Sequence, residues 1–188
     1  MCFSFEVSIG TFIFSWAASI YLLTKSLSKL QRDNVIFLMI FSTMQLADAI
    51  LWWNTMKQNQ LNYYTTSLAI PLILSVQVLF NAYIRNSGKH IWLNTLAITL
   101  SIYVFIKLNG YSKSVCAGWL SSPIWGSSEF SYWEILIFLL AIMYPTWKVI
   151  GVTALIMLPL IYALARGGYG SLWCALANIL AIIYLIKY

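Results

Sequence analysis

The chain has 188 residues, of which 61% are hydrophobic and only 9% are charged, and its net charge is +6. A soluble globular chain carries about 25% charged residues, so the composition excludes that class and predicts an integral membrane protein of one domain, 1–188. The 11 basic residues are scattered through the loops rather than clustered, which favours membrane-flanking anchors and excludes a nucleic-acid partner. The lipid bilayer is therefore the first expected partner.

Seven apolar runs follow one another along the chain. Because a helix rises about 1.5 Å per residue, a hydrocarbon core of about 30 Å needs about 20 residues, and about 17 is near the minimum. Each run therefore predicts one short span of an all-α, polytopic membrane helix bundle. Short spans favour a thin membrane or tightly packed, slightly buckled helices. The predicted spans are 7–24, 34–56, 64–84, 91–107, 132–147, 149–165 and 169–187.

The fifth and sixth runs allow two interpretations. A single helix over 132–165 would be about 50 Å long, which is too long to cross once. Pro145 disfavours helix at the residue before it and removes a backbone donor, so a turn at 145–148 is expected. Seven transmembrane helices is the prediction, and six plus a re-entrant hairpin is the alternative.

Seven spans place the two termini on opposite sides of the membrane. Basic residues are enriched in cytoplasmic loops, and they divide seven to four, which predicts the N-terminus outside and the C-terminus in the cytoplasm. The predicted cytoplasmic set is Lys25, Lys29, Arg32, Arg85, Lys89, Lys148 and Lys187, and the outer set is Lys57, Lys107, Lys113 and Arg166.

The long connection 108–131 is predicted to lie outside. Its Trp119 and Trp125 are expected to settle at the membrane interface, where indoles are enriched. An ordinary interfacial loop is the simpler interpretation, and a functional lid is the alternative.

Asp48 lies inside the second apolar run and shares one helical face with Gln45 and Trp52. A carboxyl group at this depth costs about 2.5–3.5 kcal/mol on insertion scales, so the face is expected to point into the bundle. A functional interpretation makes Asp48 the carrier of a proton or cation. A structural interpretation makes it a buried hydrogen-bonding group, protonated by desolvation.

Other spans add polar residues. Gln77, Asn81 and Arg85 follow one another at i+4 in the third span. They either line a path with Asp48, with Gln77 about 9 Å from it along the membrane normal, or make interhelical hydrogen bonds. Asn178 comes near the middle of the last span, and Cys174 lies at about the depth of Asp48.

Cysteine and histidine usage limits the chemistry. The chain has no C-x-x-C and a single histidine, His90, which excludes thioredoxin-like chemistry and a multi-histidine zinc site. No cofactor is expected. Cys2 and Cys116 would both lie outside and could form a disulfide in an oxidising compartment.

Three landmarks occur together: Met1-Cys2-Phe3-Ser4 at the start, Gln45-x-x-Asp48-x-x-x-Trp52 in the second run, and Ser171-x-Trp173-Cys174 opening the last. Their order resembles a family of small, uncharacterised multi-pass membrane proteins of bacteria and large DNA viruses, in which Glu usually stands at the position of Asp48. The resemblance implies an outer cluster that could be a ligand pocket, a structural cluster or a site for a soft metal such as copper(I), with Cys2 and Cys174 as candidate ligands. The cluster comprises Cys2, Gln45, Asp48, Trp52, Trp173 and Cys174.

The leading functional hypothesis is a channel or transporter for protons or small cations that uses Asp48. A polar cavity around Gln45, Asp48 and Asn178, opening outward beneath the 108–131 loop, is expected. The alternative is a non-catalytic membrane structural protein, or a sensor that binds a small or lipid-like ligand. A membrane enzyme or metal-binding protein is third, because no nucleophile–base pair is spaced convincingly. Assembly into a homo-oligomer is an open alternative.

Overall fold

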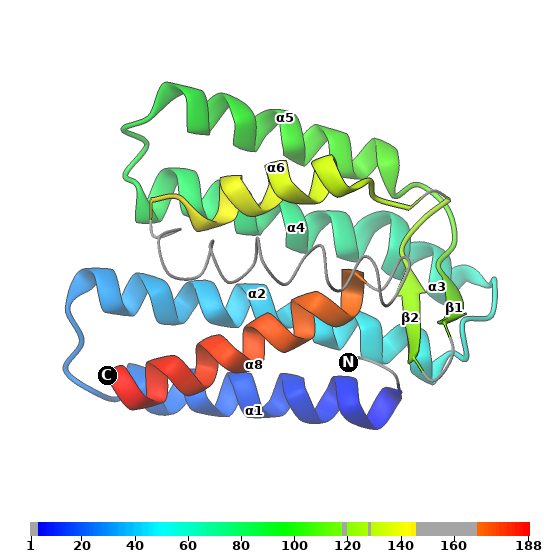
Figure 1. The fold of residues 1–188 in the computed structure, drawn as a ribbon, viewed down its shortest axis with the longest axis horizontal. Coiled ribbons are helices and arrows are strands. Elements are labelled where there is room, and N and C mark those ends of the chain that lie inside the picture. Colours follow the sequence, from blue (N-terminus) through cyan, green and yellow to red (C-terminus); the bar gives the residue numbers. More distant parts are fainter. Residues whose placement is uncertain (1–3, 118–119, 128, 146–168) are drawn as a thin grey trace.

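The computed structural model describes residues 4–117, 120–127, 129–145 and 169–188. Helices that lie side by side make up most of this part of the chain, together with one antiparallel β-hairpin (Figure 1). The elements are α1 (Phe5–Leu23), α2 (Lys29–Trp53), α3 (Gln60–Tyr64), η1 (Thr65–Ala69), α4 (Ile70–Leu79), η2 (Phe80–Arg85), α5 (Ile91–Lys107), β1 (Lys113–Ala117), β2 (Leu120–Ile124), α6 (Tyr132–Met143) and α8 (Tyr169–Lys187).

Two groups of helices meet at the contact between α2 and α4. Helices α1, α2 and α8 pack against one another, and α4, α5 and α6 form the second group (Figure 1). The segments α3, η1, α4 and η2 continue one another over 60–85, with the π-helical turns η1 and η2 near the two ends. This long helix therefore runs antiparallel to α2 along the centre of the molecule.

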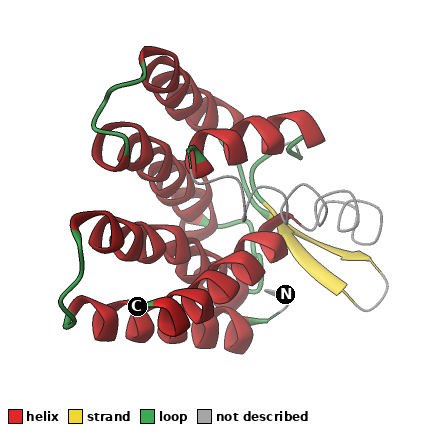
Figure 2. Cartoon of the chain, turned by 60° about the vertical axis from the view of Figure 1, so that its left-hand side comes forward, coloured by secondary structure: helices red, strands yellow, loops and turns green. Residues whose placement is uncertain are grey.

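The two ends of the bundle differ in charge and structure. The turn after α1, the end of η2, the start of α5 and the end of α8 lie together at one end, which we call the basic end (Figure 1). The strands β1 and β2 lie at the other end, which we call the hairpin end; Figure 2 shows them extending beside the helices. The basic end holds Lys25, Lys29, Arg32, Arg85, Lys89 and Lys187.

Three helical segments are long and apolar enough to cross a bilayer: α1, α2 and the continuous helix over 60–85. Helices α5 and α6 and residues 176–187 of α8 are shorter apolar helices. The structure thus confirms a helical protein with membrane-length segments. The predicted span 149–165, and with it the choice between seven spans and a re-entrant hairpin, lies outside the described residues.

Burial is distributed as expected for a protein with an apolar environment. Large apolar side chains face outward, for example Ile106 on α5, which is 72% exposed. Polar side chains face inward, which is where intramembrane polar groups find partners. Buried polar residues of the long helices include Ser8, Ser15, Ser19, Asn34, Ser42, Gln45, Asp48, Gln77 and Asn81.

Helix boundaries agree with the predicted spans where local signals set them. Helices α5 and α8 coincide with the predicted 91–107 and 169–187. Helix α2 begins five residues early, at Lys29, because Ser28 and Gln31 form a capping box. Helix α6 ends at Met143 rather than 147, because Tyr144 precedes Pro145 and is extended.

The all-α prediction is incomplete in the connection 108–131. Residues 113–117 and 120–124 pair antiparallel, with Lys113 opposite Ile124 and Ala117 opposite Leu120. A lone two-stranded hairpin is marginally stable in water, and here β2 packs against α8. Tertiary contact therefore supports strands that the local composition did not indicate.

Candidate functional site

Asp48 is fully buried in the half of α2 that faces the hairpin end. Trp125, which directly follows β2, reaches into the bundle and donates its indole N–H to Asp48 Oδ1 at 2.8 Å. The indole residue is only 6% exposed. A side chain from the connection therefore provides a hydrogen bond to the buried carboxyl across 77 positions of sequence.

The backbone after Trp125 requires glycine. Gly126 has φ +81°, and a Cβ there would lie 2.9 Å from Cα of Leu108, the residue that directly follows α5. An L side chain rarely adopts this conformation, and backbone cannot move aside as a flexible side chain can. The close approach of Gly126 to Leu108 thus fixes the path of the backbone directly after Trp125.

A buried polar network holds the start of the connection. Asn62 donates to the carbonyl of Ser112 at 3.0 Å and accepts from the Ser112 backbone N–H at 2.8 Å. The hydroxyl oxygens of Thr66 and Ser112 lie 2.7 Å apart, and Thr66 also donates to Asn62 Oδ1. The connection is therefore attached to α3 and η1 immediately before β1.

An ion pair holds the other flank. Lys107, the last residue of α5, lies 3.1 Å from Glu134 in the first turn of α6. The ammonium also lies 5.8 Å from the ring centre of Phe130. Trp125 consequently lies between two anchored flanks.

The remaining candidates of the second, third and last spans occupy different places. Gln45 and Gln77 are fully buried, and Trp52 is half-buried. Asn178 accepts a hydrogen bond from Ser15 of α1 at 3.4 Å. Helix α8 thus meets α1 through a polar contact.

The cysteine hypotheses stay predictions. Cys2 lies outside the described residues, so neither its disulfide with Cys116 nor its metal role is tested. Cys116 lies on β1 opposite Ser121, and Trp173 and Cys174 belong to the first turns of α8. Within the described part of the chain, no group of three or more His, Cys, Asp or Glu side chains could hold a metal ion.

Asn81 belongs to a second polar cluster, at the basic end. Arg85 donates from Nε to Asn34 Oδ1 at 3.1 Å, and from Nη1 to Asn81 Oδ1 at 2.8 Å and to the carbonyl of Ile142 at 3.1 Å. Asn34 and Asp48 are 14 residues apart on α2, or about 21 Å at a rise of about 1.5 Å per residue. Asn81 therefore does not lie beside Asp48.

This second polar cluster caps the C-terminal end of α6. The last carbonyls of a helix have no partner within the helix, and here side chains of η2 and its turn supply donors. Asn81 donates to the carbonyls of Ala141 at 2.6 Å and Tyr144 at 3.0 Å, and Asn86 donates to Tyr144 at 3.1 Å. The Arg85 cation at this terminus also interacts favourably with the helix dipole. Asn81 therefore makes hydrogen bonds between η2 and α6, which is one of the two roles that the sequence allowed for it.

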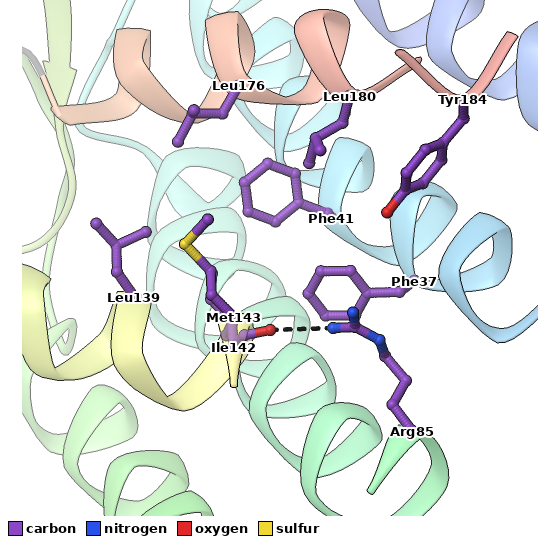
Figure 3. Close-up of a pocket in the computed structure, with 9 residues that line it drawn as sticks. All are labelled: Phe37, Phe41, Arg85, Leu139, Ile142, Met143, Leu176, Leu180 and Tyr184. Carbon is purple, nitrogen blue, oxygen red and sulfur yellow. Dashed lines mark hydrogen bonds between the residues drawn. The ribbon is translucent and has the colours of Figure 1, made fainter. Parts of the chain in front are cut away.

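A small cavity lies between α2, α6, α8 and Arg85 (Figure 3). Its volume is about 30 Å³, and its walls include the rings of Phe37, Phe41 and Tyr184. A space of this size admits about two water molecules. Asp48 does not line it, so it is distinct from the cavity expected around Gln45, Asp48 and Asn178.

Trp125 and Asn34 are the site residues whose partners the sequence did not predict. Trp125 was expected at the membrane interface, yet it is buried and bonded to Asp48. A usable signal was present, because a buried indole N–H needs an acceptor, and Asp48 is a carboxyl well inside a long apolar run. Asn34 is the first residue of the predicted second span, and nothing in its position indicated that it would accept a hydrogen bond from Arg85.

Comparison with known proteins finds no match, whether with protein-family models, curated proteins or solved structures. The family resemblance drawn from the three landmarks therefore stays a prediction, and the geometry around Asp48 carries the functional argument.

Proposed function

We propose that this chain is a multi-pass integral membrane protein that moves protons, or another small cation, across a bilayer with Asp48 as the ion-binding group. The observation that carries the proposal is the complete burial of the Asp48 carboxyl in a membrane-length apolar helix, in contact with a hydrogen-bond donor from the connecting loop. Ionisable groups inside membrane helices are costly, and they commonly mark ion pathways and proton relays.

The contact with Trp125 favours a functional role over a purely structural one. The indole N–H needs only an acceptor, and the amide oxygen of an asparagine would accept it at lower cost than a carboxyl. A carboxyl adds the ability to bind and release a proton. An aspartate rather than an asparagine at position 48 therefore supports a role in ion binding in addition to the hydrogen bond with Trp125.

Polar groups deeper in the bundle support a route away from Asp48. Gln45 is fully buried one helical turn from Asp48 toward the basic end, and Ser42 is buried one turn further. Gln77 is buried on the neighbouring helix α4. Amide and hydroxyl groups at these positions would relay a proton or ligate a cation between the hairpin end and the centre of the bundle.

The proposed topology has seven spans, with the hairpin end outside and the basic end in the cytoplasm. The grouping of basic residues at one end of the bundle supports this orientation, because cytoplasmic loops are enriched in Lys and Arg. Asp48 would then bind its ion in the outer half of the membrane.

The test is ion flux into liposomes that contain the purified protein. Asp48→Asn keeps the shape of the side chain and the acceptor for Trp125 but removes the ionisable group. We therefore expect the flux of protons or cations to fall to the level of empty liposomes. Glu129→Gln is the matched control, because Glu129 is an exposed acid of the same connection, and it should keep the flux of the unmodified protein. Circular dichroism and size-exclusion profiles establish that all variants are folded. Absence of flux in the unmodified protein, over several cations and pH values, contradicts the proposal.

A further inference from the structure

We infer that Trp125 is the residue that closes access to Asp48 from the hairpin end, so that ion entry requires the indole to leave the carboxyl. The inference rests on the proposed function and deepens it, because it names the closing residue and the side of entry. Its basis is the placement of a connecting-loop side chain directly on a buried carboxyl.

The geometry separates Trp125 from the helices that form the walls of the bundle. Asp48 belongs to α2, which packs between α1, α4 and α8. Trp125 instead lies in a loop between β2 and α6. The indole can therefore withdraw without displacing a helix.

The flanks of the connection confine such a movement to the neighbourhood of Trp125. Asn62 and Thr66 hold Ser112 before β1, and the ion pair between Lys107 and Glu134 fastens α5 to the start of α6. The backbone at Gly126 lies directly against Leu108, so it determines whether the indole points inward. A substitution at Trp125 or Gly126 thus acts on the closure while both flanks stay attached.

A chemical labelling experiment tests this closure without depending on transport. The protein in lipid nanodiscs is treated with a water-soluble carbodiimide and an amine, and the modification of Asp48 and Glu134 is followed by peptide mass spectrometry. Glu134 is half-buried at the surface and serves as the internal reference. The variants are Trp125→Phe, which removes the N–H donor, and Gly126→Ala, which forces the backbone away from Leu108. Trp133→Phe is the matched control, because Trp133 is 70% exposed at the start of α6.

Loss of one buried hydrogen bond shifts an open–closed equilibrium by roughly tenfold. We therefore expect Asp48 labelling, relative to Glu134, to rise about tenfold in Trp125→Phe and Gly126→Ala and to stay unchanged in Trp133→Phe. Unchanged Asp48 labelling in both variants would overturn the inference. An equal rise at Asp48 and Glu134 would also overturn it, since it would show that Trp125 maintains the fold rather than the closure.

The outcome is separable from that of the proposed function. Faster Asp48 labelling without flux in any variant would support the closure and contradict ion transport. Flux that depends on Asp48, with labelling that Trp125 and Gly126 do not influence, would support transport and overturn the closure.

Discussion

Arg85 donates to neutral oxygens of Asn34, Asn81 and Ile142, whereas Asp48 accepts from the indole of Trp125. Both residues are thus embedded in hydrogen bonds, as buried polar groups must be. The two sets of bonds nevertheless have different roles. Arg85 and Asn81 donate to free carbonyls at the end of α6. Asp48 instead accepts from Trp125 in a loop, and this indole N–H needs only an acceptor, not a charged one.

Replacement of Asn81 by leucine tests the structural role of the second polar cluster. The variant loses the bonds donated to Ala141 in α6 and to Tyr144 directly after it, and it loses the acceptor for Arg85. Because interhelical hydrogen bonds in membrane proteins average about 0.6 kcal/mol each and reach about 1.7, we expect a loss of about 1–3 kcal/mol in the free energy of unfolding. Unfolding by titration with a denaturing detergent measures it.

Asn109→Leu is the control for this substitution, because Asn109 makes an exposed bond to Tyr63. It should change the free energy of unfolding by less than about 0.5 kcal/mol. Equal effects of the two substitutions would contradict the capping role of Asn81.

At the scale of elements, the two π-helical turns of the helix 60–85 coincide with the two polar networks. Segment η1 contains Thr66 and Ser67, which bond to the connection after α5, and η2 contains Asn81 and Arg85. π-helical turns are rare and frequently lie at functional sites. Here each turn redirects polar side chains, at one end toward the loop that carries Trp125 and at the other toward the end of α6.

Thr66→Val tests whether the η1 network fastens the connection. Valine keeps the shape of threonine but removes the hydroxyl that meets Asn62 and Ser112. We expect a loss of about 1–2 kcal/mol in stability and faster amide hydrogen exchange at Ser112. Thr99→Val, at an exposed position of α5, should leave exchange at Ser112 unchanged; a similar acceleration there would show that the effect is not local.

For the whole molecule, the sequence predicted what local composition determines. Apolar runs are properties of neighbouring residues, so the positions of α1, α2, α5 and α8 followed from them to within a few residues. The inward orientation of Asp48 followed from the cost of its burial. Both are arguments that need no knowledge of the fold.

Contacts between distant segments could not be predicted in the same way. The bonds from Trp125 to Asp48 and from Arg85 to Asn34 join residues 77 and 51 positions apart, and they depend on how the helices pack. The hairpin β1–β2 likewise depends on its contact with α8. The sequence therefore identified Asp48 but not the residue that covers it.

The proposed orientation predicts which surfaces a membrane-impermeant reagent reaches. Single cysteines are introduced at Ser127, at the hairpin end, and at Ser26, in the turn after α1, in a chain whose own cysteines are replaced by alanine; both serines are exposed. In intact cells with the protein in the surface membrane, we expect an impermeant maleimide to label position 127, and position 26 only after permeabilisation. The reverse pattern would contradict the orientation, and labelling of both positions from one side would contradict a bundle whose two ends face opposite compartments.

The ionisable carboxyl at position 48 is tested most directly by comparing Asp48→Glu with Asp48→Asn in the liposome flux assay. Glutamate keeps the carboxyl with one more methylene, whereas asparagine keeps the shape and removes the titrating group. The account predicts measurable proton flux for Asp48→Glu and background flux for Asp48→Asn, with both variants folded. Equal flux from the two variants would contradict the claim that Asp48 carries the ion.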